Sequence, residues 1–132
     1  RAPSVETVVE NIAKSTGESV SVSGASAANL LGLSTQNPAR QIYWTSGPSR
    51  HLKLGAQNVE LKHVPSWQLR APNSRAGHAF RALAYFGKTE AGQALRRIKL
   101  QLTEEERLEL LSLRASAPTW MAKELSALAA AQ

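Results

Sequence analysis

Few residues in this chain have the types and spacing that catalysis needs. Glu60 and Lys62 stand two apart in a strand-like run, which would put a carboxylate and an ammonium on one face, as a metal-dependent nuclease requires. The chain has no aspartate, however, and carboxylates are the usual protein ligands of magnesium. A cross-strand ion pair between Lys53 and Glu60 explains these residues without chemistry. We therefore expect no catalytic residues.

The histidines, serines and aromatic residues give no stronger signal. His51, His63 and His78 form no HExxH or HxH pattern, and each is expected to be a hydrogen-bonded or surface imidazole. No GxSxG turn, GxGxxG fingerprint or Walker lysine occurs, so we predict no metal and no cofactor. Tyr43 and Trp44 could stack on single-stranded nucleic acid, but one of the two must face a covering helix.

The charge is concentrated in the middle of the chain. The formal net charge is +6 over 132 residues, and from Arg40 to Lys99 eleven basic residues stand against Glu60 and Glu90, a local balance of +9. Such a surface attracts nucleic acid or an acidic protein, or only keeps the chain soluble. There is no cysteine, no apolar run long enough to span a bilayer and no signal-peptide pattern, so we expect a cytoplasmic protein that does not bind membranes.

The elements that must position these residues are strands in the first half and helices in the second. The runs 41–45, 50–54 and 58–64 are rich in β-branched, aromatic and leucine residues and are bounded by turn residues. They predict an α+β fold with a small antiparallel or mixed sheet, a meander at about 41–64, packed with helices, and a helical C-terminal third. We expect one domain over 1–132, with the sheet and helices in 1–65, a linker at 66–75 and a helical part at 76–132.

The second predicted hairpin can be given a register. A loop at 55–58 puts apolar residues opposite apolar ones on one face of the sheet and polar ones together on the other, and a slip by one residue would exchange the faces. The predicted pairs are Leu54 with Val59, Leu52 with Leu61, Lys53 with Glu60 and His51 with Lys62.

Capping and periodicity predict the helices. Ser4 and Gly17 bound a first helix, and a short small-residue helix at 25–33 is expected to lie close against the sheet. Thr103 and Glu106 form a capping box. Among the residues predicted to face inward are Tyr85 before Gly87, Leu108 and Leu111 after the capping box, and Trp120, Met121, Leu125 and Leu128 in the last helix.

The middle of the chain resembles a known family. GASAANLLGLSTQNPA at 24–39, IYWTSGPSR at 42–50 and a glycine-centred hairpin at Gly55 are similar to the C-terminal antitoxin domain of AbiEi-like proteins, from bacterial type IV, abortive-infection toxin-antitoxin systems. The resemblance implies a domain that neutralises a nucleotidyltransferase-like toxin, directly or indirectly. The chain departs from the family's sequence pattern at Ser26, where the family frequently has an aromatic residue, and at Ser46, where the family frequently has an acidic residue.

Members of that family typically carry an N-terminal winged helix-turn-helix that binds their own promoter, and no such motif is seen here. Because the chain opens at Arg1 and its one methionine is Met121, we expect an excised C-terminal half that binds DNA only weakly. Two alternatives stay open: a nucleic-acid-binding module that supports transcriptional autoregulation, and a restriction-like nuclease at Glu60 and Lys62. The candidate partner-binding residues are Arg50, His51, Lys53 and Lys62, extended by Arg96 and Arg97.

Overall fold

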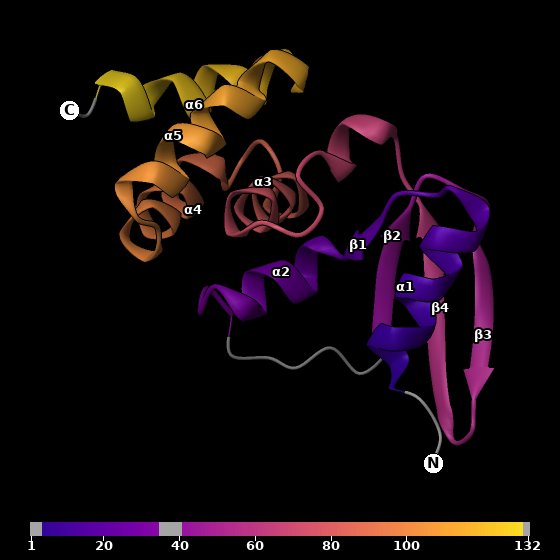
Figure 1. Ribbon diagram of the computed structural model, residues 1–132. Coiled ribbons are helices and arrows are strands. Elements are labelled where there is room, and N and C mark those ends of the chain that lie inside the picture. The colour runs from indigo at the N-terminus through magenta and orange to yellow at the C-terminus, as the bar shows by residue number, and fades with distance from the viewer. Residues whose placement is uncertain (1–3, 35–40, 131–132) are drawn as a thin grey trace.

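The computed structural model describes residues 4–34 and 41–130, and it has the α+β fold that the sequence predicts (Figure 1). A sheet with one helix in front of it forms one end of the molecule, and the last three helices form the other. In chain order the elements are α1 (Val5–Thr16), β1 (Val20–Val22), α2 (Gly24–Leu30), β2 (Gln41–Thr45), β3 (Arg50–Leu54), β4 (Gln57–His63), η1 (Ser66–Leu69), α3 (Arg75–Phe86), α4 (Ala91–Ile98), η2 (Lys99–Gln101), α5 (Glu104–Ser112), η3 (Leu113–Ser116) and α6 (Thr119–Ala130).

The strand order corrects the predicted meander. The sheet runs β1-β2-β4-β3, with β2 parallel to β4 and the other neighbours antiparallel, so β2 and β3 do not pair. Residues 46–49 must therefore pass over β4, a span of about two strand spacings, roughly 10 Å, which four residues can cover. Val59 and Leu61 of β4 have no exposed surface. The more apolar strand thus takes the central place, while His51 and Lys53 of β3 go to the edge.

The predicted register of the β3–β4 hairpin is wrong by two residues. Leu54 pairs with Gln57, Leu52 with Val59 and His51 with Glu60, which leaves a two-residue loop of Gly55 and Ala56. Gly55 has a φ of 63°, as required at the first position of the turn type that suits the twist of a tight hairpin. Because a shift of two residues keeps every side chain on its face, the predicted faces are retained.

Helix α1 covers one face of the sheet. It begins where the Ser4 hydroxyl accepts a hydrogen bond from the Thr7 amide, and it ends at Gly17 in the left-handed conformation, as predicted. Its Val9 is 4% exposed, and in Figure 1 the helix lies in front of β2 and β4. Val59 and Leu61 are buried beneath it, whereas Leu52 and Leu54 on the edge strand are only half-buried.

Helix α2 packs mainly against α3, and of the predicted contact with the sheet its start has the one between Gly24 and Trp44 of β2. Gly24 at its start permits the contact, because a Cβ there would stand 2.5 Å from the Tyr85 Cβ and 2.7 Å from the Arg81 carbonyl oxygen. The segment predicted as a linker contains η1, whose Trp67 packs edge-on against Phe80 with ring centroids 5.8 Å apart. The 66–75 segment is therefore a packed connection to α3.

The helical part carries the larger core, which α2 to α6 share. The capping box of Thr103 and Glu106 forms at the start of α5 as predicted. Tyr85 and Leu108 do not face inward: their exposed fractions are 56% and 50%, and Leu110 and Leu113 fill the core instead. Among the described helices, none is both long and apolar enough to cross a bilayer.

Candidate functional site

Five polar residues on one side of β3 and β4 form a surface, which we call the basic hairpin face. It consists of His51 and Lys53 on β3 and Asn58, Glu60 and Lys62 on β4, all on the side of the sheet away from α1. The side chain of His51 is 71% exposed, and its Nε2 lies 3.8 Å from the Glu60 carboxylate. Lys53 and Lys62 are exposed. The strand pairing holds these side chains at fixed spacing, as the sequence predicts.

Arg50 does not belong to this face, which corrects its predicted place there. It pairs with Leu61 and projects to the α1 side of the sheet, where its guanidinium donates to the Glu18 carboxylate at 2.8 Å. Thr45 donates to the same carboxylate at 2.6 Å. The hydrogen bond from Arg50, followed by that from Thr45, holds the pKa of Glu18 at about 2, below its usual 4.5. Arg50 therefore links the start of β3 to the segment between α1 and β1, which contains Glu18.

Arg96 and Arg97 also lie outside the basic hairpin face. They are on α4, and Figure 1 shows α4 and β3 at opposite ends of the molecule. Arg97 donates to the Leu33 carbonyl oxygen at 3.0 Å and so secures the chain after α2. The predicted extension of the cationic surface to these two residues is wrong, because hairpin and helix belong to separate layers.

The paired residues of the nuclease hypothesis are on one face of β4, but their neighbours differ from the prediction. Glu60 stands opposite His51, and Lys53 stands opposite Asn58. Within residues 4–34 and 41–130, no three His, Cys, Asp or Glu side chains gather as a metal site.

Trp44 is 9% exposed and packs in a cluster with Val64 and Leu69, so its ring is covered and does not offer a stacking surface for bases.

A hollow of about 200 Å³ lies between α1, β1, β2 and the start of α3. Its polar lining includes Glu6, Tyr43 and His78. Burial, and then the Glu6 charge, raise the pKa of Tyr43. Burial, and then the charges of Arg81 and Arg75, lower the pKa of His78 to about 4. No sequence pattern identifies this cluster, since its members lie in three separate segments.

A fully buried arginine contacts His78, one of the residues that line the hollow. Arg81 has no exposed surface and donates to the carbonyl oxygens of Arg70, Ala71 and Pro72 at 3.0, 3.4 and 3.2 Å. It also donates to His78 Nδ1 at 2.9 Å, which fixes the proton of the neutral imidazole on Nε2, because a guanidinium has no acceptor. Burial lowers the pKa of Arg81 to about 10. We call this arrangement the arginine clamp.

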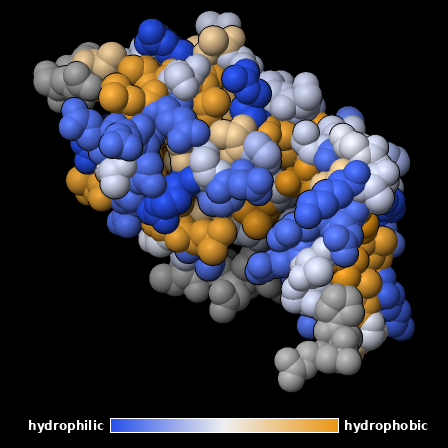
Figure 2. All heavy atoms as spheres, in the orientation of Figure 1, coloured by the Kyte–Doolittle hydropathy of each residue, from blue (hydrophilic) through white to orange (hydrophobic). Residues whose placement is uncertain are grey.

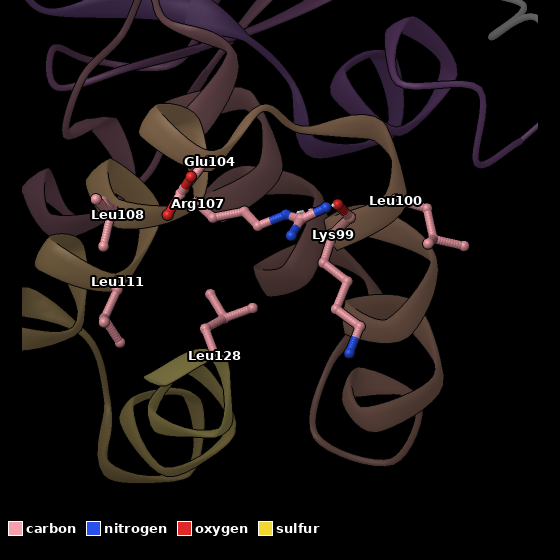
Figure 3. A pocket seen from close by; sticks show the side chains of 7 residues that line it. All are labelled: Lys99, Leu100, Glu104, Arg107, Leu108, Leu111 and Leu128. Atoms are coloured by element: carbon pink, nitrogen blue, oxygen red, sulfur yellow. Dashed lines mark hydrogen bonds between the residues drawn. The ribbon is translucent and has the colours of Figure 1, made fainter. Parts of the chain in front are cut away.

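A leucine-lined groove is found in the helical part (Figure 3). It encloses about 300 Å³ between η2, α5 and α6, where Leu108, Leu111 and Leu128 approach one another. Leu100, on its rim, is 75% exposed. The Arg107 side chain crosses the groove and donates to the Lys99 carbonyl oxygen at 3.0 Å. The sequence prediction missed this surface because it assigned Leu108 to the core.

Comparison with known proteins gives one finding. A family model described as "Family of unknown function (DUF6088)" matches residues 1–110. No curated protein matches, and no solved structure matches.

Proposed function

We propose that this chain, which belongs to the DUF6088 family of unknown function, is the antitoxin domain of a bacterial type IV toxin-antitoxin system and neutralises a nucleotidyltransferase-like toxin in the cytoplasm. The observation that carries the proposal is the likeness of residues 24–55 to the antitoxin domain of AbiEi-like proteins. These residues supply α2, β2, β3 and the hairpin turn. The α+β fold that the likeness implies is compatible with this role.

The basic hairpin face is the surface on which we expect the partner to bind. Nucleotidyltransferases hold metal ions and nucleotide with clustered carboxylates, so such a toxin presents an acidic cleft. Lys53 and Lys62 offer exposed positive charges at fixed geometry, and His51 adds an exposed imidazole. Electrostatic complementarity of this kind speeds encounter and selects the partner more than it adds affinity.

The direct test is rescue of growth. The chain is co-expressed with a nucleotidyltransferase-like toxin of a type IV system, and colonies are counted with the chain induced or uninduced. The proposal predicts that induction restores growth and that an equally abundant variant with a disrupted core, Leu61→Asp, does not. Equal colony numbers with and without the chain, at confirmed protein levels, would rule the antitoxin role out.

The same face favours a second candidate, a nucleic-acid-binding module that supports transcriptional regulation. Fluorescence anisotropy with labelled promoter duplex and single strand, read at several salt concentrations, distinguishes the two. We expect weak binding that falls with salt by a log-log slope of about −0.9 for each phosphate neutralised on duplex. Tight, sequence-selective and salt-insensitive binding would favour the second candidate over the first.

A further inference from the structure

Strand β3 leaves one edge of the sheet open. It is the last strand in the order β1-β2-β4-β3, and among residues 4–34 and 41–130 no strand lies on its outer side. In an antiparallel ladder every second residue turns its backbone N–H and C=O away from the partner strand. Those groups of β3 are therefore directed outward, in the geometry that an added strand requires.

The two faces beside this edge have different chemistry. On the side away from α1 stand His51 and Lys53, both exposed. On the α1 side stand Leu52 and Leu54, which remain half-buried because α1 lies over β2 and β4. In Figure 2, which has the orientation of Figure 1, apolar surface runs beside α1 over the region of β3. An added strand would find apolar contacts on one face, and the Lys53 ammonium and the His51 imidazole on the other.

A second copy of this chain does not fit the edge. Two β3 strands paired about a two-fold axis with their faces matched would bring His51 or Lys53 of one copy opposite His51 or Lys53 of the other. Two lysines directly opposite in an antiparallel pair repel each other, and a histidine opposite a lysine or another histidine forms no ion pair. The charge on the edge thus opposes self-association and selects a strand of opposite sign.

We propose that β3 is the docking edge for a strand of a partner protein in which acidic and apolar residues alternate. The backbone ladder would supply affinity, the acidic residues would pair with His51 and Lys53, and the apolar residues would pack beside Leu52 and Leu54 on the α1 side of the sheet. The inference goes beyond the proposed function, because it describes how a partner binds and holds whether or not that partner is a toxin.

The test uses the full chain, labelled with ¹⁵N, and a synthetic peptide of alternating glutamate and valine. We expect saturable shifts of the amide signals of residues 50–54 and slower amide exchange at His51 and Lys53. A peptide of equal charge with proline in place of alternate valines cannot form the ladder and is the matched control. Equal shifts from both peptides would show that charge alone attracts them and would overturn the proposal.

Charge exchange in the chain gives the second measurement. A His51→Gln/Lys53→Glu variant alters only exposed side chains and puts no carboxylate opposite Glu60, so it should keep the fold, and it should now prefer a peptide of alternating lysine and valine. Unchanged preference, or peptide shifts confined to the leucine-lined groove, would overturn the proposal. So would an oligonucleotide that shifts the signals of residues 50–54 and 62 when the glutamate-valine peptide shifts none of them.

Discussion

Replacement of Arg81 by methionine tests whether the arginine clamp stabilises the fold. Arg81→Met keeps an unbranched apolar stem but removes donors to four acceptors, which are the three carbonyl oxygens of residues 70–72 and His78 Nδ1. One acceptor takes a hydrogen of Nη1 and the other three share the two hydrogens of Nη2. Hydrogen bonds from a charged group contribute roughly 1.5 kcal/mol or more each, or about 4.5 kcal/mol for three donating hydrogens. This loss is the larger of two opposing effects.

The opposing effect is the cost of burying the guanidinium, whose Nε has no hydrogen-bond partner among the described residues. The lowering of the Arg81 pKa from 12.5 to about 10 corresponds to roughly 3 kcal/mol. The difference predicts that Arg81→Met lowers the free energy of unfolding by about 1.5 kcal/mol. Urea denaturation followed by circular dichroism measures it, and the exposed Arg96→Met serves as the control, with a change within about 0.5 kcal/mol.

The titration of His78, followed by NMR, gives a second measurement on the same variant. Its pKa should rise from about 4 once the Arg81 charge is gone, but stay below 6.5 because burial is the larger cause. An Arg81→Met variant as stable as the parent, with the His78 titration unchanged, would refute the account. It would mean that the carbonyl oxygens of the 70–72 segment do not depend on the arginine.

Four further predictions concern the fold. Gly77→Ala should lower the free energy of unfolding by about 1–3 kcal/mol in urea melts, because a Cβ there would stand 1.8 Å from the Ala71 carbonyl oxygen. Ala71→Gly should leave stability equal or raise it by up to about 1 kcal/mol, because Ala71 has a φ of 50°; a clear loss would contradict this. Leu61→Ala, at a site with no exposed surface, should cost about 2–5 kcal/mol in urea melts. Stability should fall as the pH drops from 6.5 to about 4, since there the unfolded chain binds a proton at His78 that the folded chain does not; His78→Gln should flatten that window. Because the pKa of Glu18 is also lowered, the free energy of unfolding should fall further as the pH drops from 4.5 to about 2.

Local signals in the sequence predict the helix ends and the strand faces. Ser4, Gly17 and the pair of Thr103 and Glu106 act through contacts within a few residues, so the sequence contains all that decides them. The faces of β3 and β4 follow from alternation alone, and they are correct although the register is shifted by two residues.

Strand order and charge placement depend on contacts between distant residues. The parallel pairing of β2 with β4 arises because burial of Val59 and Leu61 favours a central place for β4, which no hairpin signal expresses. Arg50 is drawn away from the basic hairpin face by Glu18, a residue 32 positions earlier. Arg96 and Arg97 have the same charge as the hairpin lysines but lie far from them in space. The sequence alone does not show this distance.

The most direct test of the proposed role is charge reversal on the basic hairpin face. A Lys53→Glu/Lys62→Glu variant is compared with Lys88→Glu/Arg96→Glu, which makes the same change of charge at exposed residues in or beside α4. Both should keep the melting temperature of the parent. The account predicts that the first loses rescue of cells expressing the cognate toxin and that the second keeps it. Full rescue by the first variant, at equal protein levels, would contradict it.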